Sequence, residues 1–100
     1  MSETLSPDAC TTMTEVRAAI DALDERIVSL LGQRMRYMDA AARIKSTRDA
    51  VRDEGRKAQV IDNAAAVAAK VGFPPELVRA IYEQLVEGSI AYEFERFDAR

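Results

Sequence analysis

The stretch from Val16 to Met35 reads VRAAIDALDERIVSLLGQRM and has the clearest helical pattern in the chain. Its apolar residues recur in alternating steps of four and three, at Val16, Ile20, Leu23, Ile27 and Leu30. Such a heptad-like stripe is typical of a helix that packs against another helix. The pattern continues past Gly32, so we predict one helix from about Thr14 to about Thr47, roughly 50 Å long at 1.5 Å per residue.

The length of this helix bears on how the chain folds. The whole chain has 100 residues, and a domain of this size buries only about two-thirds of the surface of its unfolded chain. A helix of roughly 50 Å is too long for a compact monomer of this size. We therefore expect the helix either to kink or to pack along another chain.

The remainder of the sequence predicts two shorter helices and no strands, because no alternation of apolar and polar residues is found. Gly72 is a good helix stop, and the prolines after it suit the start of the next helix. We predict an all-α fold with a single domain over residues 13–100. Its parts are a flexible lead-in at residues 1–12, the long helix, a charged loop at Ser46–Gly55, a second helix at Arg56–Lys70 and a third helix after Pro74-Pro75.

Composition narrows the possible functions. The net charge is −3, so we do not expect binding to nucleic acid or to an anionic membrane. No apolar run is long enough for a signal peptide or a membrane span. Cys10 is the one cysteine, which fits a reducing compartment, and we expect the cytoplasm.

The sequence contains no histidine. This excludes His-based acid–base catalysis, Ser-His-Asp and Cys-His arrangements, and nearly all zinc sites. The available chemistry must therefore use Arg, Lys, Glu, Asp or Ser, and we expect no cofactor.

Two cations of the long helix share one face. Arg34 falls on the apolar line four residues after Leu30, and Lys45 follows eleven residues later, about 16 Å along the axis. A buried arginine is costly unless it is paired. The two cations either bind a small dianion between them, or pair with internal carboxylates or extend to water.

Arg17 lies about 25 Å from Arg34 along a straight helix, so it cannot reach the same small ligand from the same chain. In an antiparallel dimer, the start of one long helix approaches the middle of its partner, and Arg17 would complete the site in trans. Alternatively, Arg17 is a surface arginine near a helix start.

Glu93 occupies an apolar line of the third helix, and Ser89 shares its face four residues earlier. A carboxyl group among apolar neighbours favours its protonated form, which donates a hydrogen bond. The alternative is a Glu93 carboxylate paired with an inward-facing arginine. Asp53 and Arg56 near the end of the loop are compatible with a plain exposed ion pair.

Together these residues resemble the helical chorismate mutases. The segment Val16–Met35 resembles the start of the long first helix of that family. The match extends over R-x-K ending at Lys45, VRDEGR at Val51–Arg56 and EGSIAYE at Glu87–Glu93. It covers nearly the whole chain, and the motif is specific because it consists of several spaced polar residues.

The resemblance implies an intertwined homodimer that binds a small dicarboxylate, chorismate, in two equivalent sites. It implies that Arg34 and the partner's Arg17 bind the two carboxylates of the substrate, and that Lys45 meets the ether oxygen and a carboxylate. Glu93, which is often Gln in the family, would hydrogen-bond the breaking ether oxygen. The remaining implied contacts are a cationic one from Arg56, and Asp53 and Ser89 near the ring hydroxyl and a carboxylate.

Two positions depart from the family pattern. Glu93 donates only when protonated, so we expect activity to fall as rising pH removes its proton. Many family mutases carry a Glu directly after the arginine that matches Arg56, and it holds the ring hydroxyl. Here that residue is Lys57, which bears on the hydroxyl contact and on the choice of substrate.

We favour a chorismate mutase that forms prephenate for aromatic amino acid biosynthesis, and two alternatives stay open. A sister branch, the isochorismate-pyruvate lyases, makes salicylate and pyruvate with the same fold and cationic cage. The Cys10-Thr11 lead-in and the length of the Lys45–Arg56 loop resemble that branch, whereas Asp53 and Ser89 resemble the mutases. The other alternative is a noncatalytic helical dimerisation module, which would not explain the charges on the apolar lines.

Overall fold

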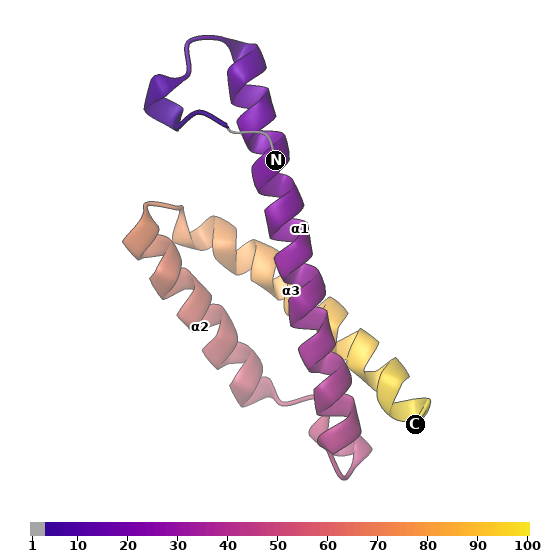
Figure 1. Ribbon diagram of the computed structural model, residues 1–100. Helices are drawn as coiled ribbons and strands as arrows, with labels where there is room; N and C mark the ends of the chain where they lie inside the picture. The colour runs from indigo at the N-terminus through magenta and orange to yellow at the C-terminus, as the bar shows by residue number, and fades with distance from the viewer. Residues whose placement is uncertain (1–3) are drawn as a thin grey trace. The chain divides into compact units, whose positions relative to one another are not determined.

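The computed structural model describes residues 4–100, and its regular elements are all helical. The predicted all-α class, with one long and two shorter helices, is confirmed (Figure 1). The three α-helices are α1 at Met13–Ile44, α2 at Glu54–Val71 and α3 at Pro75–Asp98, and the two 3-10 turns are η1 at Pro7–Ala9 and η2 at Arg48–Ala50. Within residues 4–100, no helix combines the length and the apolar character that crossing a membrane requires.

A complete capping box starts α1. The Thr12 hydroxyl accepts a hydrogen bond from the Glu15 amide at 3.2 Å, and Glu15 Oε1 accepts from the Thr11 and Thr12 amides at 2.9 Å each. The bond from the Thr11 amide, followed by those from Thr12, lowers the pKa of Glu15. The helix begins at Met13, one residue before the predicted start at Thr14, because the Thr12-x-x-Glu15 pair caps it.

The lead-in predicted as flexible, residues 1–12, begins outside the described residues. Its described part includes η1, where Cys10 donates its amide hydrogen to the Pro7 carbonyl. Whether the lead-in is flexible stays a prediction.

The helix α1 ends at Ile44, three residues before the predicted end at Thr47. Thr47 is extended, with φ −129° and ψ 152°, and η2 follows it. The helix α2 begins two residues before its predicted start, because Asp53 caps it. Its predicted stop is confirmed: Gly72 has a φ of 76°, in the left-handed region that favours glycine.

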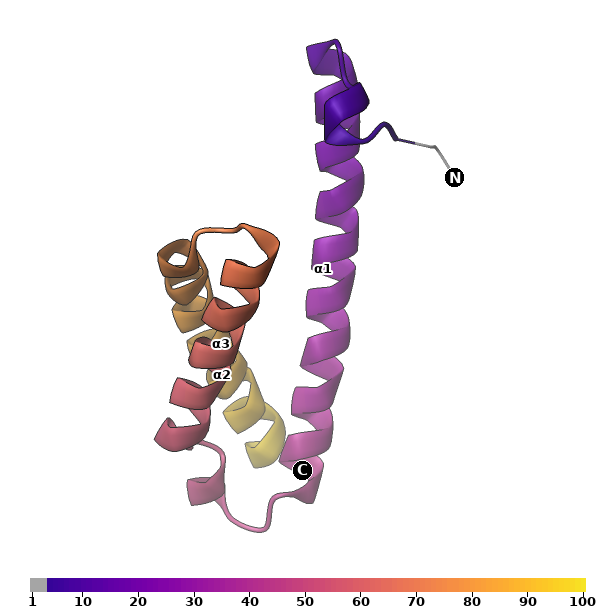
Figure 2. The ribbon, with the colours of Figure 1, turned by 90° about the vertical axis from the view of Figure 1, so that its left-hand side faces the viewer.

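The chain divides into two compact units, one up to Arg36 and one over Tyr37–Arg100. The described part of the N-terminal unit holds η1 and the first part of α1. The C-terminal unit holds the end of α1, η2, and the packed helices α2 and α3, which are joined by the turn at Gly72 (Figure 2). Its core is the buried cluster Val51, Val86 and Ile90, against which Val60, Ile61, Tyr82, Phe94 and Phe97 pack.

The N-terminal unit has a different surface. Four residues of its heptad-like stripe are about half exposed: Ile20 at 48%, Leu23 at 51%, Ile27 at 52% and Leu30 at 58%. Apolar side chains of this size gain free energy when they leave water. The stripe is therefore an apolar helix face that the described chain does not cover.

Candidate active site

A buried acid and a partly exposed cation meet in the C-terminal unit. Lys45 follows the last residue of α1, and its Nζ lies 2.7 Å from Oε2 of Glu93 on α3. The Glu93 side chain is 5% exposed and that of Lys45 is 29% exposed. Lys45 Nζ also lies 3.5 Å from the carbonyl oxygen of Val51. The ammonium group thus bridges the end of α1, the loop after it and α3.

The sequence left two possibilities for Glu93, a protonated donor or a carboxylate paired with a cation. The structure shows the pair. Glu93 pairs with a cation, although the cation is Lys45 and not an arginine. The charge has a low cost here because the pair is hydrogen-bonded and one member reaches solvent.

Ser89 lies one helical turn before Glu93 on α3 and is 3% exposed. Its hydroxyl donates a hydrogen bond of 2.7 Å to the Leu85 carbonyl. Ser89 and Glu93 are the two buried polar residues of α3. The expectation that they share one face is confirmed, and this face also carries the core residues Val86 and Ile90.

Asp53 and Arg56 are in contact through the backbone. Asp53 Oδ1 accepts a hydrogen bond of 3.0 Å from the Arg56 amide, which caps α2. The guanidinium of Arg56 donates to Gln59 Oε1 at 2.7 Å, and both Asp53 and Arg56 are exposed. The contact is therefore a helix cap and not the exposed ion pair that their spacing allowed.

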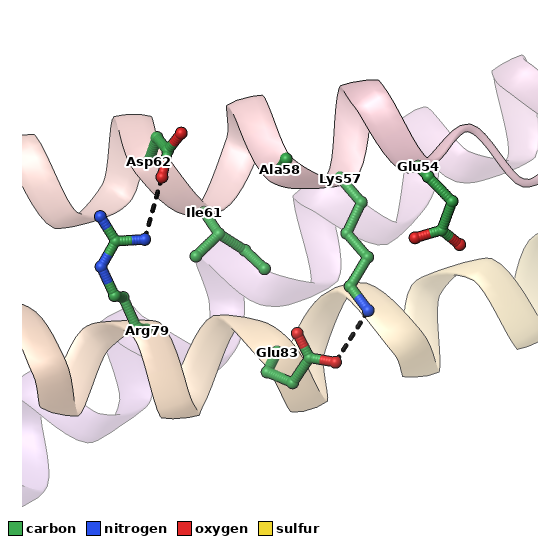
Figure 3. A pocket seen from close by; sticks show the side chains of 7 residues that line it. All are labelled: Glu54, Lys57, Ala58, Ile61, Asp62, Arg79 and Glu83. Carbon is green, nitrogen blue, oxygen red and sulfur yellow. Dashed lines mark hydrogen bonds and ion pairs between the residues drawn. The ribbon is translucent and has the colours of Figure 1, made fainter.

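Lys57 connects α2 to α3. Its Nζ lies 2.7 Å from Glu83 Oε1 and 2.9 Å from Glu87 Oε2. The hydrogen bond to Glu83, followed by that to Glu87, raises the pKa of Lys57. Figure 3 shows its side chain directed toward Glu83. Both residues line a cavity of about 290 Å³. Lys57 thus meets two carboxylates of its own chain.

Glu87 is shared between two cations that flank the start of α2. Arg52 forms two hydrogen bonds to it, at 2.9 and 3.1 Å, and Lys57 adds the third. The hydrogen bonds from Arg52, and then that from Lys57, lower the pKa of Glu87 to about 2. These contacts fasten the start of α2 to α3.

The two remaining predicted site residues, Arg17 and Arg34, belong to the N-terminal unit. Arg17 is exposed, and Arg34 is half-buried and has interactions of its own. Of the predicted site residues, the structure brings together Lys45 and Glu93 in an ion pair. It also brings together Asp53 and Arg56 in a helix cap.

Several contacts near Lys45 had no signal in the sequence. Asp39 accepts a hydrogen bond of 2.6 Å from the Tyr92 hydroxyl and lies 3.3 Å from Arg96 Nε. Arg100 donates to carbonyl groups at the end of α1, at Ala42 and Lys45. The polar side chains in these contacts lie at exposed or half-exposed positions, where a periodic pattern does not distinguish a bonded polar group from a solvated one.

Comparison with known proteins decides the family. A model of the chorismate mutase type II family matches residues 16–94. The chain belongs to the chorismate mutase type II family. The resemblance inferred from spaced polar residues is thereby confirmed.

A curated relative connects the chain to a second activity within this family. Isochorismate pyruvate lyase of Pseudomonas aeruginosa is 34% identical over 86 residues, which cover 86% of this chain and 85% of that protein. The family and this relative support an enzyme of the chorismate mutase or isochorismate pyruvate lyase type.

The described arrangement suits stabilisation of charge more than covalent chemistry. The partly exposed ammonium group of Lys45 lies next to the buried carboxyl group of Glu93. A cation in such a place attracts an anionic ligand and donates hydrogen bonds to an oxygen that gains charge. The neighbouring acid either orients the cation or, when protonated, acts as a second donor.

Proposed function

We propose that the chain is a chorismate mutase that converts chorismate to prephenate. The single observation that carries this proposal is the 2.7 Å contact between Lys45 and the buried Glu93. The resemblance implies that both residues contact the ether oxygen, and they come from segments 48 residues apart. A cation and a potential hydrogen-bond donor that lie side by side can both stabilise the ether oxygen as its C–O bond breaks.

The chemistry needs little from the protein. In this pericyclic rearrangement a C–O bond of the substrate breaks at the ether oxygen while a C–C bond forms, without a nucleophile, metal or cofactor. The protein must hold the flexible dianion in a reactive shape and direct donors at the ether oxygen. Lys45 would donate to the ether oxygen and a carboxylate, and Glu93 would be the second donor.

Glu93 must carry a proton to be that donor. In the described structure it is an ion-pair partner of Lys45. The two carboxylates of a bound substrate would compete with Glu93 for the Lys45 ammonium. We propose that the bound state frees the Lys45 ammonium to contact the substrate while Glu93 donates its own proton to a hydrogen bond.

The other site residues would supply the remaining contacts. Arg34 would bind one carboxylate, and the partner's Arg17 would bind the other. Arg56 would add a positive charge at the start of α2, with Asp53 and Ser89 near the ring hydroxyl and a carboxylate. Lys57, held by Glu83 and Glu87, would contribute positive charge and not a hydroxyl acceptor.

The two-chain site requires a homodimer, and the exposed stripe of α1 supports one. Four large apolar residues, each about half exposed, follow a heptad-like spacing along the first part of α1. That spacing suits the α1 of a second copy, because matching stripes bury one another. The single Cys10 fits a cytoplasmic enzyme.

Isochorismate pyruvate lyase activity is the second candidate, and two observations favour it. The relative that is 34% identical carries that name. In addition, Lys57 stands where many family mutases carry a Glu. The same cationic contacts would then hold isochorismate and release salicylate and pyruvate.

A direct assay separates these two activities. Purified protein is incubated with chorismate and, separately, with isochorismate, while chorismate loss and salicylate fluorescence are followed. The proposal predicts chorismate loss with formation of prephenate. Turnover of isochorismate alone, with salicylate as product, would establish the second candidate in place of the first.

One variant tests both candidates against a noncatalytic dimerisation module. Arg34→Ala removes a proposed carboxylate contact, so an enzyme should lose nearly all turnover, about 100-fold or more. Sedimentation should show the same oligomeric state as the unaltered protein. Unchanged turnover by the variant would remove Arg34 from the site, and no turnover by the unaltered protein on either substrate would favour the module.

A further inference from the structure

The carboxyl end of α1 has an unusual cap. The last carbonyl groups of a helix have no partner within it and need donors from elsewhere. Here the guanidinium of Arg100 supplies them: Nη1 lies 3.1 Å from the Ala42 oxygen and 2.6 Å from the Lys45 oxygen, and Nη2 lies 3.4 Å from the Ser46 oxygen. One side chain thus bonds several carbonyls across the end of the helix.

Arg100 is itself held in place. Its guanidinium carbon stacks 3.7 Å from the centroid of the Phe97 ring, and Phe97 packs against the core of the C-terminal unit. A positive charge at the carboxyl end of a helix is also favoured by the helix dipole. The guanidinium therefore connects the core near the end of α3 to the end of α1.

Lys45 is fixed from three directions. Its amide donates to the Ala41 carbonyl at 2.9 Å, its carbonyl accepts from Arg100 at 2.6 Å, and its ammonium meets Glu93 at 2.7 Å. Its backbone is thus held by the helix on one side and by Arg100 on the other. The direction in which its side chain leaves α1 depends on both.

We propose that Arg100 is a positioning residue, which holds the Lys45 backbone so that the Lys45 ammonium meets Glu93. Glu93 lies in α3 and contacts the Lys45 side chain, and Arg100, two residues after the end of α3, bonds the Lys45 carbonyl. Without Arg100, the end of α1 exchanges its cap for water, and the ammonium no longer has one preferred position. That this matters for catalysis rests on the proposed function.

The protein offers a spectroscopic test, because it has only the three lysines Lys45, Lys57 and Lys70. Proton–nitrogen NMR of the ammonium groups reports lysines held in ion pairs. Lys45 and Lys57 are so held, and Lys70 is exposed. In Arg100→Ala, the Lys45 signal should be lost while the Lys57 signal stays.

Arg48→Ala is the matched control. Arg48 also ties down the end of α3, through Asp98 at 3.0 Å and through the Phe94 ring at 4.4 Å, without bonding the carbonyls of α1. This variant should keep both lysine signals. Arg100→Lys should restore part of the Lys45 signal, because it returns a cation to the helix end but only one donor atom.

The kinetic measurement uses chorismate and the same variants. Arg100→Ala should lower kcat about tenfold with a smaller change in KM, because misplacing a positioned donor acts mainly at the transition state. Arg48→Ala should leave both constants unchanged. Retention of the Lys45 signal in Arg100→Ala, or equal loss of the Lys45 and Lys57 signals, would overturn the proposal.

The turnover assay tests the proposed function, and the lysine NMR tests the role of Arg100, so either can fail without the other. If the unaltered protein turns over neither chorismate nor isochorismate, the proposed function is wrong. The NMR result still decides whether Arg100 positions Lys45.

Discussion

Every buried apolar residue among residues 4–100 lies in the C-terminal unit, and the N-terminal unit has none. Ile90 in the C-terminal unit is 8% exposed within a core, whereas Ile27 in the N-terminal unit is 52% exposed on one face of α1. The C-terminal unit also forms ion pairs between residues that are distant in sequence, as at Lys45–Glu93 and Lys57–Glu83. The C-terminal unit therefore has a buried core, although it also exposes large apolar residues such as Ile81 at 47%, whereas the apolar stripe of the N-terminal unit is about half exposed along its described length.

The largest effect is expected at the contact that links α1 to α3. Lys45→Met removes a donor proposed for the ether oxygen, so kcat should fall by about 100- to 1,000-fold. It also leaves the Glu93 carboxylate buried without its cation, and thermal unfolding should show a loss of stability. Lys70→Met removes an exposed lysine and is the matched control. A Lys45→Met enzyme with ordinary kcat would exclude Lys45 from the chemistry.

The next effect concerns association through the N-terminal unit. Ile27→Asp places a charge in the middle of the exposed stripe, and a dimer formed there should dissociate at micromolar concentration. Ser29→Asp adds the same charge about 200° around the helix, and it should affect association much less. Sedimentation velocity distinguishes the two. If Ile27→Asp sediments as the unaltered protein does, the stripe is not the dimer surface.

A third comparison shortens the same side chain in each unit. Ile90→Ala should lower the free energy of unfolding by about 2–5 kcal/mol, because it leaves a cavity in a packed core. Ile27→Ala should act chiefly on the dissociation constant of the dimer. Urea unfolding and sedimentation equilibrium, applied to both variants, measure the two effects. Equal effects in both assays would mean that the two units share one core.

The smallest effect is a pH dependence of stability at Glu87. Its pKa is lowered from 4.5 to about 2 by Arg52 and then Lys57, so the folded state binds this proton less tightly than the unfolded state. The resulting stability is present above about pH 4.5 and is lost as the pH falls toward 2. Glu87→Gln should therefore lower the Tm at neutral pH, and by progressively less below pH 4.5.

Glu76→Gln is the control, since Glu76 is 90% exposed. Its effect on the Tm should be small and nearly the same at every pH. A Glu87→Gln difference that persists undiminished at low pH would show that the ion pairs are not its source.

The fold class was predictable from spacing alone, whereas the helix ends were not. The heptad-like stripe predicts α1, and Gly72 marks the end of α2. At the end of α1, Lys45 accepts a hydrogen bond from Arg100, 55 residues later in the chain, and no local pattern contains such a contact. The start of α1 follows from a local pattern, because Thr12 and Glu15 have the spacing of a capping box.

In the candidate site, local spacing predicts which residues face inward but not which distant residues they contact. Glu93 interrupts an apolar line in the sequence, which predicts an inward-facing carboxyl group, and the residue is 4% exposed in the structure. Its partner could not be chosen from sequence, because helical spacing places residues on a face but does not say which distant cation meets them. The ion pairs of Arg52 and Lys57 with Glu87 likewise join segments that only the packing of α2 on α3 brings together.

The central claim is that Glu93 acts as a protonated donor beside Lys45, and the rate of chorismate turnover as a function of pH tests it most directly. The unaltered enzyme should lose activity as the pH rises, because its Glu93 loses the proton that it must donate. Glu93→Gln donates without titrating, so this variant should stay active with a nearly flat profile. A flat profile for the unaltered enzyme into the alkaline range, or an inactive Glu93→Gln variant, would contradict the claim.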